Sequence, residues 1–407
     1  MDTQQTEAVD EQAAAPDTSA QPGATPPDAV TVRREAFLQC ERTLNGHPPR
    51  SMRAELLALA ESVGPDEQPD RYGGGALIEA FEREIAELLG KEAAVFMPSG
   101  TMAQQIALRI WSERSGRTTV AFHPTCHLEI HENKGYERLH GLHATLVGQA
   151  ERVITLDDLR ATPEPLAALL LELPQREIGG QLPEWEALAE QTAWARSRGA
   201  AAHMDGARLW EVAAYYGRSY AEIAALFDSV YVSFYKGVGA ITGAALAGPA
   251  EFVAEARIWQ RRHGGNLLHL WPYVLSARAA LHARLSRFAS YHAKAVEIAA
   301  ALTQVDGVIL KPNPPQTHIA HVYLRGDTER LLDASAELAR KQRLALFTWL
   351  QPAPIPGYAM FEMSIGDGAQ ELAGDEVAGT PAQLLALEIL NASFGDGSEP
   401  QRANGEV

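Results

Sequence analysis

The chain has 407 residues, of which 46% are hydrophobic and 21% are charged, and its formal net charge at pH 7 is −17. A length of this order suggests roughly two or three domains, and the hydrophobic fraction excludes a fully disordered or fibrous protein. A surface this negative repels phosphate backbones, so we expect no nucleic-acid partner. The two cysteines, Cys40 and Cys126, cannot form a disulfide framework, which favours a reducing, cytoplasmic setting.

Neither a signal peptide nor a membrane span is expected. The N-terminus carries acids and glutamines instead of a basic stretch followed by an apolar one. The longest apolar run, residues 165–173, is interrupted by Glu172 and is far shorter than the roughly 20 residues that a spanning helix needs. We therefore expect a soluble cytoplasmic protein without a membrane partner.

The two ends of the chain differ in composition from its body. Before Arg33 there are six acids and four prolines but no basic residue, and such a segment cannot bury enough apolar surface to offset the entropy of ordering. We predict a disordered acidic leader over residues 1–35 and a flexible tail over 394–407. Between them we predict a large domain over 36–272 and a small C-terminal domain over 273–393.

The large domain reads as alternating helices and apolar strands. Apolar residues recur at helical spacing before Gly90, and a short apolar run follows at 93–97. A helix is expected at 183–198, and further strands are expected at 118–122, 168–173, 200–204 and 229–234. This order predicts an α/β fold with a mostly parallel sheet that helices cover on both faces.

After Trp271 the pattern changes. One long helical stretch is predicted over 274–302, and strands are predicted at 319–324, 344–347 and 359–365. This combination indicates a smaller α+β domain.

Lys236 is one of only six lysines, and it follows an apolar strand at a turn that contains Gly237 and Gly239. Burial lowers the pKa of a lysine, and the neutral amine can form an imine with an aldehyde. A strand-end lysine whose amine reaches solvent fits the same pattern and is, taken alone, the commoner case.

Asp205 ends another predicted strand, and Arg208 follows it closely. Ligands bind at the carboxyl ends of parallel strands, and a buried carboxylate there needs a cationic partner. A protonated pyridine nitrogen would serve as that partner, and so would Arg208.

Ser99, Gly100 and Thr101 lie between a predicted strand and a helix. Free amides at a helix N-terminus bind phosphate, although an ordinary helix cap explains the same residues. His127 follows a further strand, where its ring could stack on an aromatic cofactor or simply lie on the surface.

An aldehyde for the lysine, a ring cation for the aspartate and a phosphate for the helix end are combined in pyridoxal 5'-phosphate. With these motifs in this order, the sequence resembles the threonine aldolase and β-eliminating lyase family of fold-type I pyridoxal-phosphate enzymes. The resemblance is strongest over residues 90–102, over 203–208 and in the lysine segment that ends at Gly248.

The resemblance implies a role for each cofactor-binding residue. Lys236 would bond covalently to the cofactor, and Asp205 would pair with its ring nitrogen. Ser99, Gly100 and Thr101 would hold the phosphate. His127 would stack on the ring and take part in proton transfer.

The substrate-binding residues agree less well with the family. Arg208 is expected to reach the substrate carboxylate, and Glu132 matches an acidic position of the family. Glu362 stands where the family has a carboxylate-binding arginine, and Arg176 is a candidate replacement unless it only pairs with Glu177. Two further departures are Gly46 or His47 at a serine position and Leu268 at an arginine position.

From this resemblance we expect a lyase that cleaves a β-hydroxy-α-amino acid to glycine and an aldehyde. Two alternatives remain open from the sequence: β-elimination from a β-substituted amino acid, and a cofactor-binding homologue with a non-standard substrate. The family also implies a small-molecule amino-acid substrate and a homodimer or homotetramer.

Overall fold

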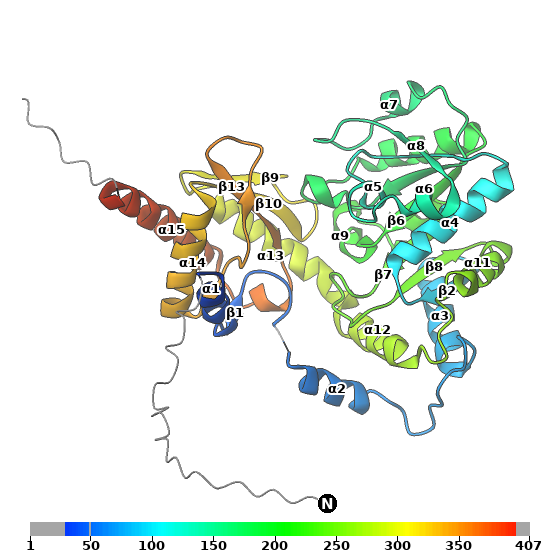
Figure 1. The fold of residues 1–407 in the computed structure, drawn as a ribbon, viewed down its shortest axis with the longest axis horizontal. Helices are drawn as coiled ribbons and strands as arrows, with labels where there is room; N and C mark the ends of the chain where they lie inside the picture. Colours follow the sequence, from blue (N-terminus) through cyan, green and yellow to red (C-terminus); the bar gives the residue numbers. More distant parts are fainter. Residues whose placement is uncertain (1–28, 49, 396–407) are drawn as a thin grey trace, which may run out of the picture.

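The computed structural model describes residues 29–48 and 50–395 (Figure 1). Residues 1–28 of the predicted leader and residues 396–407 of the predicted tail lie outside this described part. Residues 29–35, which we expected to belong to the leader, instead lie in helix α1 (Ala29–Leu38). This helix is ordered by tertiary contacts, because Ala36 is buried and Arg33 forms ion pairs with the C-terminal part of the chain.

A sheet in the order β2-β8-β7-β6-β5-β3-β4 forms the centre of the larger part. All of its strands run in the same direction except β8, which is antiparallel to both of its neighbours. The mostly parallel sheet predicted from the sequence is therefore confirmed. The strands are β2 (Ala93–Met97), β3 (Thr119–Phe122), β4 (His143–Leu146), β5 (Ala168–Glu172), β6 (Ala201–Gly206), β7 (Ser229–Ser233) and β8 (Ala244–Gly248).

Helices cover both faces of this sheet (Figure 1). The side chains of β2 show this alternation, because Val95 packs with helices α4 and α11 whereas Phe96 packs with α3 on the other face. The helices of this part are α3 (Ala76–Leu88), α4 (Gly100–Ser115), α5 (His127–Ile130), α6 (Gly135–His140), α7 (Leu156–Arg160), α8 (Trp185–Ser197), α9 (Ala213–Tyr216), α10 (Tyr220–Ala225) and α11 (Ala250–Arg262).

The smaller part contains an antiparallel sheet in the order β12-β13-β10-β9. Its longest strands, β10 (Ile319–Arg325) and β13 (Tyr358–Ser364), lie where the sequence predicts strands. The other elements are β9 (Val308–Lys311), β12 (Gln351–Pro352), α14 (Thr328–Gln342) and α15 (Gly374–Gly395).

The single helical stretch predicted over 274–302 is wrong, because two helices occupy it. Helix α12 (Trp271–Arg284) ends at a short 3-10 turn, and α13 (Phe288–Leu302) begins after that turn. The break lets Arg284 and Arg287 both donate to the carboxylate of Asp367, at 2.9 and 3.0 Å. This ion-pair cluster is a tertiary contact that helical periodicity does not reveal.

The first described segment packs on the C-terminal part of the chain. Helix α1 lies beside α14 (Figure 1), and strand β1 (Arg42–Thr43) pairs in parallel with β11 (Leu344–Ala345). The strand predicted at 344–347 is therefore shorter than expected. From β1 the chain passes through α2 (Met52–Glu61), which contacts α12, before it enters the large sheet. Among residues 29–48 and 50–395, no helix combines the length and apolar character needed to cross a membrane.

Candidate active site

The residues predicted to form a site follow strands that end at one edge of the central sheet. Because β8 is reversed between β2 and β7, strand β2 runs in the same direction as β3, β5, β6 and β7. Their carboxyl ends therefore meet at the edge where ligands of α/β proteins bind. At or just after these ends the chain places Ser99, Gly100, Thr101, His127, Glu172, Asp205 and Lys236.

Asp205 and Lys236 influence each other inside the protein. Asp205 is 2% exposed, and its Oδ1 accepts a hydrogen bond from the Ala207 amide at 3.0 Å. Burial raises the pKa of Asp205 and lowers that of Lys236, and each shift is opposed by the charge of the other residue. The Lys236 amine is therefore biased toward the neutral form that attacks carbonyls.

The buried Asp205 carboxylate forms no ion pair within the described part of the chain. The Arg208 guanidinium lies 3.3 Å from Glu211 and 3.8 Å from Glu362, so it is not the partner of Asp205. A buried carboxylate is costly unless a cation compensates it. This observation favours an external ring cation over Arg208 as the partner of Asp205.

Glu172 is a site residue that sequence reasoning missed. It lies opposite Asp205 in the register of β5 and β6, and its carboxylate accepts hydrogen bonds from Gln175 Nε2 and from the Arg176 amide. Burial, followed by the charge of Asp205, raises the pKa of Glu172 to about 7. An acid that ends an apolar strand, next to the strand of Asp205, is the signal that could have identified it.

The N-terminus of α4 is shaped for an anion. Ser99 precedes the helix in an extended conformation and makes no side-chain cap, so the first amides of α4 remain free to donate. A Cβ atom on Gly100 would lie 1.9 Å from Tyr231 Oη. Only glycine fits this close approach of the helix to β7.

His127 is held by a buried carboxylate. Its Nδ1 lies 3.0 Å from Glu132 Oε1, and Glu132 Oε2 accepts a hydrogen bond from Gln105 Nε2 at 3.2 Å. The Glu132 side chain is 3% exposed and that of His127 is 36% exposed. The imidazole is therefore fixed from one side, and its other nitrogen stays available for proton exchange.

Part of the Arg208 guanidinium makes no hydrogen bond within the described residues. Its side chain is 13% exposed, it donates one hydrogen bond to Glu211, and its Nε is buried without a hydrogen-bond partner. Arg208 and Lys236 line the same cavity of about 240 Å³, together with His47 and His318. A guanidinium in this state is suited to bind a carboxylate that enters beside Lys236.

Arg176 lies closer to carboxylates than Arg208 does. Its Nη1 donates to Glu177 Oε1 at 2.8 Å, and its Nε lies 2.9 Å from Glu362 Oε2. The surface pairing of Arg176 with Glu177, which the sequence left open, is thus present. Glu362, whose orientation the sequence left open, lies against Arg176, and its Oε1 is 3.8 Å from Arg208 Nη2.

His47 and Leu268, the two further positions that differ from the family, have different surroundings. His47 Nε2 lies 2.9 Å from the carbonyl oxygen of Gly237, so this residue contacts the loop that carries Lys236. Leu268 is 46% exposed.

The geometry agrees with what comparisons with known proteins find. The sequence profile of the family described as β-eliminating lyase matches residues 46–325. Two solved structures match 88% of this chain and 99% of their own, at 40% and 42% identity with TM-scores of 0.84 and 0.83. They are a Listeria monocytogenes protein provisionally assigned as an L-allo-threonine aldolase and an Exiguobacterium protein provisionally assigned as an aromatic amino acid β-eliminating lyase or threonine aldolase.

A curated relative supports the same grouping. A probable low-specificity L-threonine aldolase of Arabidopsis thaliana is 28% identical over 290 residues, which cover 69% of this chain and 80% of the relative. Together these matches confirm the fold class and the family resemblance drawn from the sequence.

Proposed function

The chain belongs to the threonine aldolase and β-eliminating lyase family, and we propose that it is a pyridoxal-phosphate-dependent lyase that cleaves β-hydroxy-α-amino acids to glycine and an aldehyde. The observation that carries this proposal is the buried Asp205 carboxylate, which forms no ion pair in the described chain and acts on the pKa of Lys236. Pyridoxal phosphate would supply that cation and, when bound, an electron-accepting ring that stabilises negative charge at the substrate Cα.

The residues at the sheet edge fit this cofactor. Lys236 would bond to it, and Asp205 would keep its ring nitrogen protonated. Gly100 and Thr101, preceded by Ser99, would donate amides to the phosphate at the start of α4. The His127 ring, fixed by Glu132, would stack on the cofactor.

Arg208 would bind the α-carboxylate of the substrate. Arg208 lines the Lys236 cavity, and its carboxylate contacts, at 3.3 and 3.8 Å, are longer than the 2.8 and 2.9 Å contacts of Arg176. We therefore assign binding of the substrate α-carboxylate to Arg208 and not to Arg176.

Cleavage of the Cα–Cβ bond requires a base for the β-hydroxyl proton. His127 is suited to this step because Glu132 holds Nδ1 and leaves Nε2 to accept a proton. Lys236, whose pKa is lowered by burial, is suited to exchange a proton at Cα.

We further propose a cytoplasmic homodimer or homotetramer. Leu267 and Leu268 support oligomerisation, because they are exposed apolar side chains that a subunit interface would cover. Light scattering on the purified protein tests the oligomeric state, and a monomer that retains full activity would contradict this part of the proposal.

The reaction is tested by incubating the cofactor-loaded protein with L-threonine, L-allo-threonine and L-serine, while glycine, aldehydes and keto acids are measured in parallel. We expect equal amounts of glycine and acetaldehyde from the two threonines. Keto acid without glycine would instead establish β-elimination, and no product from any of the three would refute the proposed substrate class.

A further inference from the structure

A second cavity, of about 600 Å³, adjoins the proposed active site. Arg176 and Glu362 form part of its wall. Glu362 approaches Arg208, which lines the Lys236 cavity, and the Arg176 amide donates to Glu172 at the sheet edge. His131, on the same wall, has its ring centroid 5.0 Å from that of His127. The cavity therefore borders residues of the proposed active site.

The charged groups of this cavity leave carboxylates in excess. Glu177 and Glu362 share the single guanidinium of Arg176, at 2.8 and 2.9 Å. Arg208 donates its hydrogen bond to Glu211, and its contact with Glu362 is a longer ion pair of 3.8 Å. His131, 2.9 Å from Glu177, offsets the remaining charge only when it is protonated.

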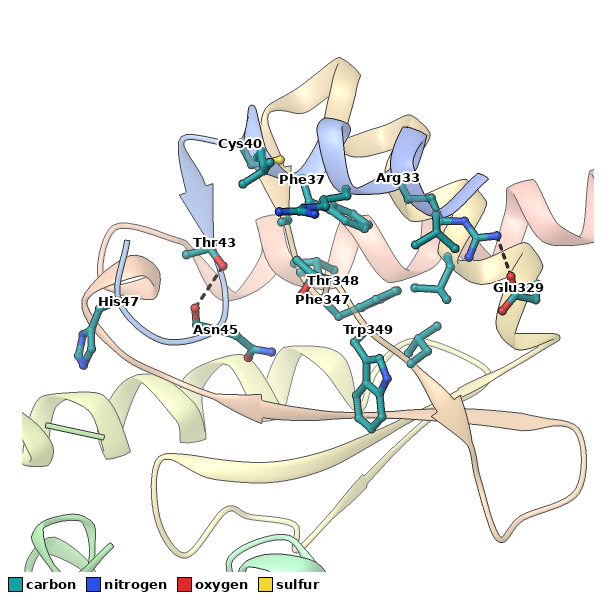
Figure 2. Close-up of a pocket in the computed structure, with 17 residues that line it drawn as sticks. Arg33, Phe37, Cys40, Thr43, Asn45, His47, Glu329, Phe347, Thr348 and Trp349 are labelled. Carbon is teal, nitrogen blue, oxygen red and sulfur yellow. Dashed lines mark hydrogen bonds and ion pairs between the residues drawn. The ribbon is translucent and has the colours of Figure 1, made fainter. Parts of the chain in front are cut away.

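Trp349, Tyr323 and the imidazole of His321 contribute aromatic rings to the wall. Trp349 is 59% exposed, and His321 and Tyr323 lie on β10 with ring centroids 6.4 Å apart. Burial lowers the pKa of His321 and so favours its neutral ring. Figure 2 shows Trp349 at the edge of a neighbouring cavity that extends from His47 to Arg33, so the indole contributes to two cavities.

We propose that this second cavity receives the β-side chain of the substrate and selects side chains that end in an organic cation, such as a primary amine or a guanidinium. Carboxylates bind the charge, and aromatic faces attract it through their negative π-clouds. The volume of the cavity also exceeds what the methyl group of threonine needs. The inference rests on the proposed function, because it concerns the same site.

Three β-hydroxy-α-amino acids of matched length test this selection: 3-hydroxylysine, 3-hydroxynorleucine and 3-hydroxy-2-aminoadipate. Their side chains end in an amine, a methyl group and a carboxylate, and each would release glycine. We expect kcat/KM to be highest for the amine and about tenfold lower for the carboxylate. One charge contact that changes from attractive to repulsive alters kcat/KM by about this factor. Equal rates for the three, or a preference for the carboxylate, would overturn the inference.

Two variants test whether the carboxylates of this cavity cause the preference for the amine. Glu362→Gln and Glu177→Gln should each reduce the preference for amine over carboxylate severalfold while threonine is still cleaved. Glu61→Gln, an exposed acid on α2, is the matched control and should leave the preference unchanged. A preference that survives both glutamine variants would also contradict the assignment.

Equilibrium binding separates this inference from the proposed function. If none of the substrates, threonine included, yields glycine, the proposed function fails. The Kd values of the same three amino acids, measured by calorimetry, then still test the cavity. The amine must bind most tightly, and any other order overturns the inference.

Discussion

Glu172 and Asp205 are register partners at the ends of adjacent parallel strands, and the charge of Lys236 acts on both carboxylates. Burial, followed by the charge of Asp205, disfavours ionisation of Glu172, and burial likewise disfavours ionisation of Asp205. Lys236 supplies the opposing charge in both cases. In the protein without cofactor the pair therefore tends to retain a proton near neutral pH.

This proton makes the stability of the cofactor-free protein depend on pH through Glu172. Its pKa is about 7 in the folded protein against an ordinary value of 4.5. The folded state thus binds the proton more tightly, and the resulting stability is complete below pH 4.5 and is lost as pH rises through 7. Glu172→Gln cannot ionise and should exceed the wild type in stability at pH 8 by up to about 3 kcal/mol.

Thermal unfolding of both proteins between pH 4.5 and 8 measures this difference. The advantage of Glu172→Gln should shrink as pH falls toward 4.5, and Glu61→Gln should show no such trend. A difference that stays constant across the pH range would mean that Glu172 does not hold the proton.

Gly100→Ala tests the close approach of α4 to β7. The new methyl group would lie 1.9 Å from Tyr231 Oη, whereas a Cβ atom on Gly379 meets nothing within 4 Å. We expect Gly100→Ala to lose about 1–3 kcal/mol of stability and to bind pyridoxal phosphate more weakly. Gly379→Ala, inside α15, should lose no stability and should bind the cofactor like the wild type. Calorimetric unfolding and a cofactor titration measure the two effects, and unchanged cofactor affinity would argue against a phosphate site at this helix end.

Arg208→Ala tests the carboxylate assignment. Loss of a charge-assisted hydrogen bond of about 1.5–3 kcal/mol should raise KM for threonine roughly 10- to 100-fold and change kcat less. Arg208→Lys keeps the charge but not the planar fork, so it should recover only part of the affinity. Arg114→Ala removes a surface arginine that pairs with Glu251 and Glu255, and it should leave KM unchanged.

If Arg176 binds the carboxylate instead, Arg176→Ala will raise KM more than Arg208→Ala does. Steady-state kinetics on the two variants decide between the arginines.

Much of the fold follows from local sequence signals. The apolar run that became β5 lies between Pro165 and Pro174, and the runs that became β6 and β7 follow Gly199 and Asp228. The direction of the strands follows from the helices between them. What the sequence does not reveal depends on tertiary contacts. Helix α1 is held by contacts with α14, and the break between α12 and α13 is fixed by Asp367, which is remote in sequence.

The candidate site shows the same limit. Lys236 and Asp205 could be found because each follows an apolar strand of a parallel sheet. Glu172 is equally placed at a strand end, but its importance depends on its pairing with Asp205, which the sequence does not state. The position of Glu362 against Arg176 likewise requires two distant parts of the chain to meet.

The measurement that tests the central claim most directly is borohydride reduction of the cofactor-loaded protein followed by peptide mass spectrometry. Reduction fixes the cofactor on the lysine that holds it. We predict a phosphopyridoxyl group on the peptide that contains Lys236, and none in Lys236→Ala, whereas Lys294→Ala should be labelled like the wild type. A label on another lysine, or an unlabelled wild-type protein, would contradict the account.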